Sequence, residues 1–171
     1  MQELETSNIL NLDETISKNI FDNATYPWEV LTKINDFIIK LGNELDLNKF
    51  EKKSENIWIA KSAKIAPTSC IIGPCIIDED AEIRHSAFIR GNAIVGKNVV
   101  VGNSTELKNV IIFNNAQVPH YNYVGDSILG YKSHMGAGSI ISNLKSDKSL
   151  VTVKCNNEKI ETNLKKFGAI L

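Results

Sequence analysis

One short stretch of the chain gathers residues that could carry out proton transfer. His120, Tyr123 and Asp126 follow one another at three-residue intervals, a Gly-Ala-Gly run begins at Gly136, and Asn143 lies beyond it. A neutral imidazole, whose ordinary pKa is about 6.5, can accept a proton at neutral pH. We therefore predict a general base at His120; a surface histidine without a chemical role is the alternative. Asp126 receives no role, because a carboxylate here could simply hydrogen-bond a bend.

Two cations further upstream share one position of a repeating pattern. Arg90 follows Ile89 and Lys108 follows Leu107, and the two pairs are 18 residues apart. If one coil of the chain contains three six-residue units, these cations lie on one face in adjacent coils. Their backbones are then about 5 Å apart, the spacing between neighbouring strands. An anion between them would relieve their repulsion, which predicts a phosphate site. The alternative is two solvated cations with Glu106 as a local counter-charge.

From residue 59 onward, large aliphatic residues recur every six positions. This first stripe consists of Ile59, Ile65, Ile71, Ile77, Ile83, Ile89, Val95, Val101 and Leu107. A second stripe four positions behind holds small or slender residues: Ala63, Ser69, Cys75, Ala81, Ala87, Ala93, Val99 and Thr105. Such a repeat is typical of short strands joined by bends, whose stacked coils bury a continuous core. The spacing predicts a solenoid.

The six-residue register changes in the segment that contains His120. It continues weakly at Phe113 and Pro119, and the next clear set is Tyr123, Leu129, Met135 and Ile141. We therefore predict a bulge or protrusion near His120. A solenoid can place functional groups at such a point with little disturbance of its core.

The residues before the repeat have helical patterns. Pro27 suits the first turn of a helix, and Gly42 lies near its other end. The apolar residues that would share one face of this helix are Trp28, Leu31, Ile34, Ile38, Leu41 and Leu45. A shorter helix is predicted from Asp13 to Phe21. We expect residues 13–45 to be mainly helical and to cap the first coil.

The repeat stops after Asn143. The alternation of residues 149–160 predicts a hairpin that turns at Asn156-Asn157. The apolar tail at residues 168–171 is typical of the start of another coil, which we expect to have an open edge. We divide the chain into a helical N-terminal segment (1–54), a β-helix (55–142), and an extruded loop or hairpin with the start of a further coil (143–171).

The composition is that of one ordinary globular domain. The chain has 171 residues, 43% apolar and 23% charged, and its 19 basic and 20 acidic side chains are mixed along the sequence. The net charge of −1 argues against a nucleic-acid partner, and no apolar run is long enough to predict a membrane span or a signal peptide. Cys70, Cys75 and Cys155 fit neither a disulfide framework nor a zinc site. We expect a cytoplasmic protein without a metal.

The residues around His120 resemble a known family. The pattern His-x-x-Tyr-x-Gly-Asp from His120 to Asp126, followed by Gly-Ala-Gly-Ser from Gly136 to Ser139, is similar to one domain of bacterial and archaeal bifunctional enzymes. That domain is the acetyltransferase of enzymes combining glucosamine-1-phosphate N-acetyltransferase with UDP-N-acetylglucosamine pyrophosphorylase. The resemblance covers about residues 84–171. It implies a mainly β fold, a left-handed parallel β-helix of hexapeptide repeats, and a homotrimer with its sites between subunits.

The resemblance also implies an activity and roles for individual residues. The activity is acetyl transfer from acetyl-CoA to an amino-sugar phosphate, within UDP-N-acetylglucosamine-type metabolism. His120 is the implied general base, and Asn143 contacts the amino sugar; we predict both as catalytic. The implied substrate-binding set is Arg90 and Lys108 for the phosphate, Tyr123 for positioning, and Glu106 and Lys148 beside them. The cofactor-binding residues stay unassigned.

The chain departs from that family in ways that leave alternatives open. It contains no Gly-x-Gly-Thr-Arg nucleotide loop, so we predict no pyrophosphorylase activity. His134 and Leu144 replace residues that are often asparagine and tyrosine in the family, which leaves the sugar open. A non-catalytic trimeric sugar-phosphate-binding protein and an acyltransferase for another acceptor remain alternatives. Metal hydration chemistry, as in γ-class carbonic anhydrases, is disfavoured because His85, His120 and His134 contain no His-x-x-x-x-His pair.

Overall fold

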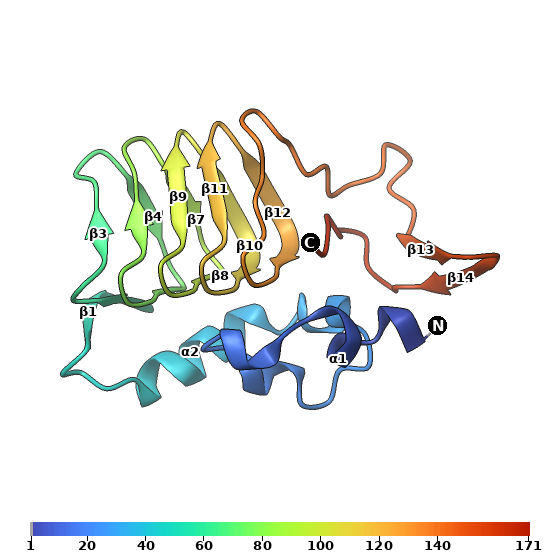
Figure 1. Cartoon of the computed structure of the whole chain (residues 1–171), viewed down its shortest axis with the longest axis horizontal. Coiled ribbons are helices and arrows are strands. Elements are labelled where there is room, and N and C mark those ends of the chain that lie inside the picture. The colour runs from blue at the N-terminus through green and yellow to red at the C-terminus, as the bar shows by residue number, and fades with distance from the viewer. Residues whose placement is uncertain (1) are drawn as a thin grey trace.

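The computed structural model describes residues 2–171 and contains a left-handed parallel β-helix, as predicted (Figure 1). Each coil has three faces. The first face contains β3 (Lys64–Ile65), β6 (Glu82–Ile83), β9 (Val100–Asn103) and β11 (Gln117–His120). The second face begins with β4 (Cys70–Ile72) and β7 (Phe88–Arg90), and the third with β2 (Ile57–Ala60), β5 (Cys75–Ile77) and β8 (Ala93–Val95). Two longer strands, β10 (Glu106–Ile112) and β12 (Tyr123–Leu129), run along the second face and turn onto the third.

The six-residue stripe forms the core of the coils, as predicted. Its members are buried or half-buried inside the solenoid together with most of the small residues of the second stripe. Each large aliphatic pairs with its equivalent one coil away, for example Ile59 with Ile77 and Ile77 with Val95. The coils therefore stack in register and bury one continuous apolar column.

The predicted continuation of the stripe is partly wrong. Phe113, Pro119 and Tyr123 are not its members; the inward residues after Leu107 are Ile112, Val118, Val124, Leu129, Met135 and Ile141. The reason is a shorter corner between the second and third faces. Paired residues are 18 positions apart at Ile77 and Val95 but 17 apart at Val95 and Ile112. The register thus changes within β10, before His120, and no bulge is needed there.

The N-terminal residues form a layer of short helices beneath the coils. These helices are η1 (Gln2–Leu4), α1 (Thr6–Ile9), η2 (Leu12–Glu14), η3 (Lys18–Phe21), η4 (Pro27–Val30) and α2 (Ile34–Glu44). The helix expected from Pro27 to Leu45 is therefore two elements, a 3₁₀ turn that begins at Pro27 and an α-helix that begins at Ile34. The helix expected over residues 13–21 is likewise replaced by two 3₁₀ turns, η2 and η3. Among residues 2–171 no helix is long and apolar enough to cross a membrane.

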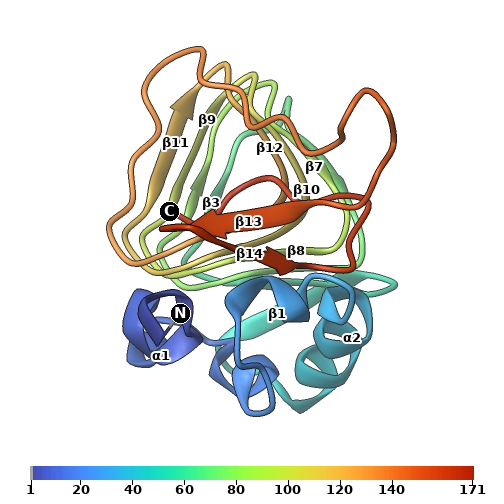
Figure 2. The same cartoon turned by 90° about the vertical axis from the view of Figure 1, so that its right-hand side faces the viewer.

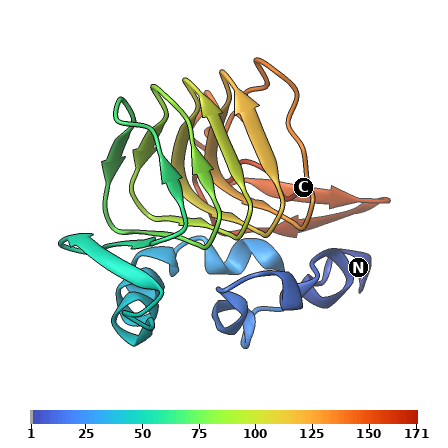
Figure 3. The ribbon, with the colours of Figure 1, turned by 60° about the vertical axis from the view of Figure 1, so that its left-hand side comes forward.

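The helical layer lies along the third face and does not cap the first coil, contrary to our expectation (Figures 1 and 3). The third-face strands present apolar residues outward as well as inward, so this face needs a cover. The outward residues that the helices bury are Trp58, Ile76, Ile94, Ile111 and Ile128. The cover is close, because a Cβ added to Gly42 of α2 would overlap the Trp58 ring. β1 (Phe50–Ser54) leads out of the layer and pairs antiparallel with β2.

The chain after the coils folds back onto them. The predicted hairpin is present as β13 (Thr152–Cys155) and β14 (Glu158–Glu161), which are antiparallel. The tail then pairs with the third-face part of β12, where Ile170 forms a parallel bridge with Ile128. Figure 2 shows this tail at the end of the coils, next to the helical layer. The division of the chain at residues 54 and 142 stays a prediction. Strand pairing crosses both positions, because β1 pairs with β2 and the tail pairs with β12.

Candidate functional site

Three polar residues are stacked at the corner where the second face turns onto the third. Asn109 and Asp126 occupy this corner in successive coils, each with a positive φ, of 54° and 49°. Asparagine and aspartate tolerate this left-handed conformation better than other residues with a side chain. Asn143 follows 17 positions later, at the same place in the next coil. We call Asn109, Asp126 and Asn143 the corner ladder.

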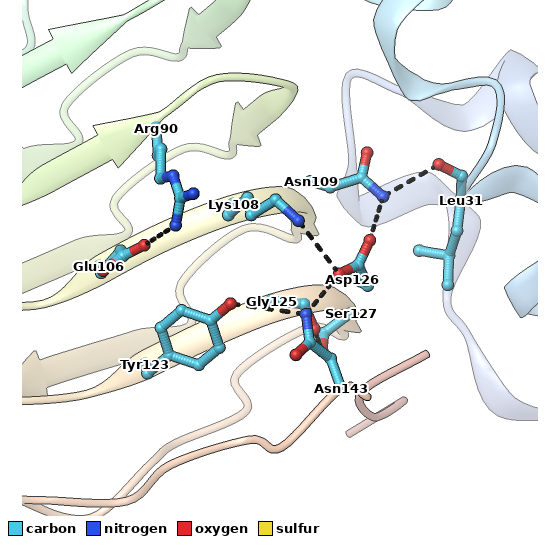
Figure 4. Close-up of polar contacts among 10 residues, drawn as sticks. All are labelled: Leu31, Arg90, Glu106, Lys108, Asn109, Tyr123, Gly125, Asp126, Ser127 and Asn143. Atoms are coloured by element: carbon cyan, nitrogen blue, oxygen red, sulfur yellow. Dashed lines mark hydrogen bonds and ion pairs between the residues drawn. The ribbon is translucent and has the colours of Figure 1, made fainter. Parts of the chain in front are cut away.

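Asp126 is the centre of the corner ladder (Figure 4). Its side chain is buried, with a relative exposure of 6% for the residue. Oδ1 accepts a hydrogen bond from Asn109 Nδ2 at 2.9 Å, and Oδ2 accepts one from Asn143 Nδ2 at 2.5 Å. Lys108 Nζ lies 3.7 Å from Oδ2. A buried carboxylate needs such partners, and here two amides and one cation supply them.

The ladder is joined to elements on both sides. Asn109 Nδ2 also donates to the backbone carbonyl of Leu31 at 3.1 Å, so the helical layer contacts the corner directly. Asn143 Nδ2 lies 3.5 Å from the Tyr123 hydroxyl, which reaches along β12 from the other end of the second face. The structure thus brings together four predicted site positions: Lys108, Tyr123 and Asn143 through these contacts, and Glu106 through its pairing with Tyr123 in the sheet.

Arg90 and Lys108 lie in neighbouring strands of the second face, as the repeat predicted. Our repulsion argument for an anion between them is wrong, however, because each cation already has a carboxylate partner. Arg90 Nη1 donates to Glu106 Oε1 at 2.8 Å, and this hydrogen bond raises the pKa of the guanidinium. Lys108 pairs with Asp126. The Arg90 side chain is still half exposed, so a ligand on the second face can contact it.

His120 ends β11, at the corner before the second face. It is exposed and occupies the same corner as Asn103 and His85 in the two preceding coils. Backbone hydrogen bonds join these corners, because the carbonyls of Asn103 and His85 each accept from an N–H of the next coil. Buried Asn122 fixes this corner: its Oδ1 accepts from the His120 backbone N–H, and its Nδ2 donates to the carbonyl of Gly136 at 2.8 Å. The Gly-Ala-Gly run is thereby held against the histidine corner, which explains why the motif residues occur together.

The structure does not bring all predicted residues together. His120 and Asn143 lie at opposite ends of the second face, and within residues 2–171 no hydrogen bond joins them. Lys148 is exposed in a turn closed by its own N–H and the Lys145 carbonyl, away from the ladder. Within the part of the chain that the structure describes, no cluster of three or more His, Cys, Asp or Glu side chains could hold a metal ion.

A groove of about 520 Å³ opens on the side of the corner ladder that faces the helical layer. It lies between the helical layer and the C-terminal segment, and Lys108 and Asp126 form one wall. Lys165 and Lys166 line the opposite wall and are exposed. These cations can contact the phosphate groups of a ligand.

Sequence reasoning missed Asn109 and gave Asp126 no role. The available signal was the recurrence of asparagine or aspartate at residues 92, 109, 126 and 143, each 17 positions after the last. This 17-residue interval was not expected from the sequence, because the earlier coils repeat every 18 residues. The structure shows that the later coils contain 17.

The sequence of the chain matches a known protein family. The family model described as "GMPPB C-terminal domain" matches residues 71–165. The "Bifunctional protein GlmU" of Methanococcus maripaludis strain S2 is 36% identical over 157 residues, which cover 90% of this chain and 38% of that protein. The "Bifunctional sugar-1-phosphate nucleotidylyltransferase/acetyltransferase" of Sulfurisphaera tokodaii is 30% identical over 149 residues, covering 75% of this chain and 36% of that protein. The chain spans a little over a third of the length of these relatives.

Among solved structures, the "Acetyltransferase domain of PglB from Neisseria gonorrhoeae FA1090" aligns with a TM-score of 0.33 and 17% identity, over 50% of this chain and 48% of that one. The assignment of the fold therefore rests on the strand pairing within this chain, described above.

Proposed function

This chain belongs to the GMPPB C-terminal domain family. From this premise, and from its similarity to the bifunctional relatives, we propose that it is an acetyltransferase domain that transfers an acetyl group from acetyl-CoA to the amine of an amino-sugar phosphate. The acceptor that we propose is glucosamine 1-phosphate or a close analogue, whose product enters UDP-N-acetylglucosamine-type metabolism. The observation that supports this most is the second face, which has a histidine at one corner, an ordered amide at the other, and two cations between them. We place the reaction in the cytoplasm.

The proposed reaction uses His120 as a general base. The substrate nitrogen attacks the thioester carbonyl, a C–N bond forms, and the C–S bond breaks. The proton lost by the nitrogen passes to the imidazole, and coenzyme A leaves as a thiol after protonation. Exposed His120 can meet the substrate amine and acetyl-CoA from solvent.

The remaining residues of the site bind and orient the acceptor in this proposal. Arg90 and Lys108 hold the phosphate by charge-assisted hydrogen bonds, in exchange for part of their contact with Glu106 and Asp126. Tyr123 and Asn143 lie side by side and contact the sugar. Lys148, on its exposed turn, would have to move or meet the ligand from another subunit.

We propose a homotrimer with its sites between subunits. Two large apolar side chains on or beside the second face are strongly exposed, Ile72 with 48% and Ile140 with 72% of their surface. Apolar surface of this kind next to polar site residues is typical of a subunit interface.

The activity can be tested with acetyl-CoA and a panel of amino-sugar phosphates, with the product identified by mass spectrometry. We expect one acetyl group on the nitrogen of the accepted sugar and no product from sugars without an amine. Binding of an amino-sugar phosphate without any acetylated product would support the alternative, a non-catalytic sugar-phosphate-binding trimer. An acetylated product formed only from an unphosphorylated acceptor would contradict the proposal. The chain has no Gly-x-Gly-Thr-Arg nucleotide loop, so we assign only acetyl transfer to it.

A further inference from the structure

The hydrogen bonds of Asp126 fix which way the Asn143 amide points. An ionised carboxylate only accepts hydrogen bonds, so the group of Asn143 that contacts Asp126 Oδ2 must be the NH₂ group. The second N–H of the same amide is directed to the Tyr123 hydroxyl at 3.5 Å. The amide oxygen therefore lies on the side away from Asp126, as Figure 4 shows. Within residues 2–171 it accepts no hydrogen bond, so it can accept one from a ligand.

The same argument fixes Asn109. Its NH₂ group donates to the Leu31 carbonyl at 3.1 Å and to Asp126 Oδ1 at 2.9 Å, and neither of these oxygens can donate in return. A flipped Asn109 would place oxygen against oxygen at both contacts. Asn109 thus holds the Asp126 carboxylate in one orientation and anchors it to the helical layer.

We infer that Asp126 is a positioning residue, which acts through Asn143 and is held in place by Asn109. Its carboxylate makes Asn143 present a hydrogen-bond acceptor on the second face. The ligand group that meets this acceptor must be a donor, such as an amine or a hydroxyl. This inference rests on the proposed function for the identity of the ligand, but the orientation of Asn143 is a property of the chain alone.

The substitution that tests the orientation is Asp126→Asn. Asn109 and Asn143 donate to different oxygens of Asp126, and an amide replaces one of these oxygens with an NH₂ group. In this variant NH₂ would therefore face NH₂ at one of the two contacts, and one of the two neighbouring amides must turn. The double exchange Asp126→Asn with Asn143→Asp should repair this. The new amide at position 126 accepts from Asn109 and donates to the new carboxylate at position 143, which still offers an acceptor to the ligand. Asp80→Asn is the matched control, because Asp80 is also an aspartate with positive φ at a corner but is exposed and lies far from the ladder in the fold.

The ligand pair for the test is glucosamine 1-phosphate and 2-deoxyglucose 1-phosphate, which lacks the donor at carbon 2. Calorimetric titration of the wild type should show a preference of about tenfold or more for the first, since a site built to bond a donor rejects the analogue without it. Asp126→Asn should reduce this preference to about threefold or less, with affinity for the deoxy sugar changed by less than about twofold. The double exchange should restore the preference, and Asp80→Asn should leave it unchanged. A full preference retained by Asp126→Asn would overturn the inference.

Side-chain amide spectra of the ligand-free protein test the positioning without any sugar. In ¹⁵N-edited NMR spectra, Asp126→Asn should shift the NH₂ resonances of both Asn109 and Asn143, whereas Asp80→Asn should shift neither. Unmoved Asn143 resonances would contradict the inference even if glucosamine 1-phosphate binds. If the wild type binds neither sugar phosphate, the proposed function is wrong, and these spectra alone decide whether Asp126 orients Asn143.

Discussion

Arg90 and Lys108 are paired with carboxylates in the ligand-free chain. They can bind a phosphate only if it replaces part of their contact with these carboxylates. A dianionic phosphate competes well with a single, partly exposed carboxylate for a guanidinium, and half-exposed Arg90 can turn toward it. For Arg90 the cost of the exchange is small, because a largely exposed ion pair contributes about 1 kcal/mol or less.

We expect Arg90→Ala and Lys108→Ala each to weaken binding of an amino-sugar phosphate by about tenfold, while binding of the unphosphorylated sugar changes by less than about twofold. Calorimetric titration of both sugars into each variant measures this difference. Lys64→Ala, which removes an exposed lysine from the first face, is the control and should affect neither ligand. Equal losses for both sugars would mean that the two cations are only surface charges.

Asp78 shows the opposite situation, a buried carboxylate with too few partners. It is 1% exposed; Oδ1 accepts from the Glu79 backbone N–H at 2.7 Å, but Oδ2 has no hydrogen-bond partner within residues 2–171. Burial raises its pKa above the ordinary 3.8, although the Glu79 N–H, Lys97 and Lys49 oppose the shift and the Glu79 charge adds to it. A raised folded-state pKa means that the protonated form favours folding. Its contribution to stability is fully present below pH 3.8 and is lost as the pH rises through the folded-state pKa.

Asp78→Asn should therefore stabilise the protein at pH values above the folded-state pKa of Asp78, where the wild-type group is charged. We expect a gain on the order of 1 kcal/mol, or a Tm higher by about 2 to 4 °C. The gain should shrink as the pH falls through the folded-state pKa, because the wild-type carboxyl then becomes protonated. Thermal unfolding across this pH range tests it, with Asp80→Asn on the exposed neighbouring position as control. A lower Tm above that pKa would show that Asp78 is stabilised by a partner not yet recognised.

At the scale of the strand and coil, sequence periodicity predicted the architecture but not the path of every strand. The inward stripe from Ile59 to Leu107 was predicted because each coil there repeats in multiples of six. Phe113, Pro119 and Tyr123 were misplaced because β10 turns its corner with one residue fewer, and a six-residue count cannot detect this. Asn109 takes the place of the Gly91-Asn92 pair of the previous coil, and left-handed asparagines occur at many other corners as well.

The coils also differ in how closely their backbones approach one another. A Cβ added to Gly102 of β9 would overlap the backbone of Pro119 in β11. Two coils after Gly102, a Cβ on Gly136 would meet nothing nearer than Ser139 Oγ at 3.8 Å. The two glycines thus form a matched pair, one enclosed by backbone and one open.

Gly102→Ala should lower the free energy of unfolding by about 3 kcal/mol, because a strand backbone must move to admit the methyl group. Gly136→Ala should change it by less than about 0.5 kcal/mol. Urea unfolding of the two variants beside the wild type measures both values. Similar stabilities of the two variants would refute the close packing of β9 on β11.

For the molecule as a whole, the sequence predicted a helical segment before the coils but placed it at the wrong surface. The signal for its true position was present: Trp58, Ile76 and Ile94 recur every 18 residues one position before the inward stripe, and Ile111 and Ile128 continue them. The site was predicted in part from the motif around His120. Its buried centre was not, because Asp126 takes its partners from other coils and, through Asn109, from Leu31 in the helical layer.

A trimer is the expected solution state. Sedimentation equilibrium at micromolar concentration should give three times the chain mass of 19.0 kDa. Ile140→Glu beside the second face should shift the equilibrium toward monomer, while Leu47→Glu, at an equally exposed apolar position between α2 and β1, should not. A wild-type monomer, or dissociation by both variants alike, would contradict the proposed interface.

The most direct test of the account is the rate of thiol release from acetyl-CoA in the presence of glucosamine 1-phosphate, compared between the wild type and His120→Ala. A general base acts on the transition state, so the variant should lose about 10²-fold or more in turnover while its affinity for the sugar phosphate stays within about twofold. His85→Ala, in the same column of stacked corners, is the matched control and should keep full turnover. An active wild type whose turnover is unchanged by His120→Ala would contradict the central claim that this histidine accepts the proton in acetyl transfer.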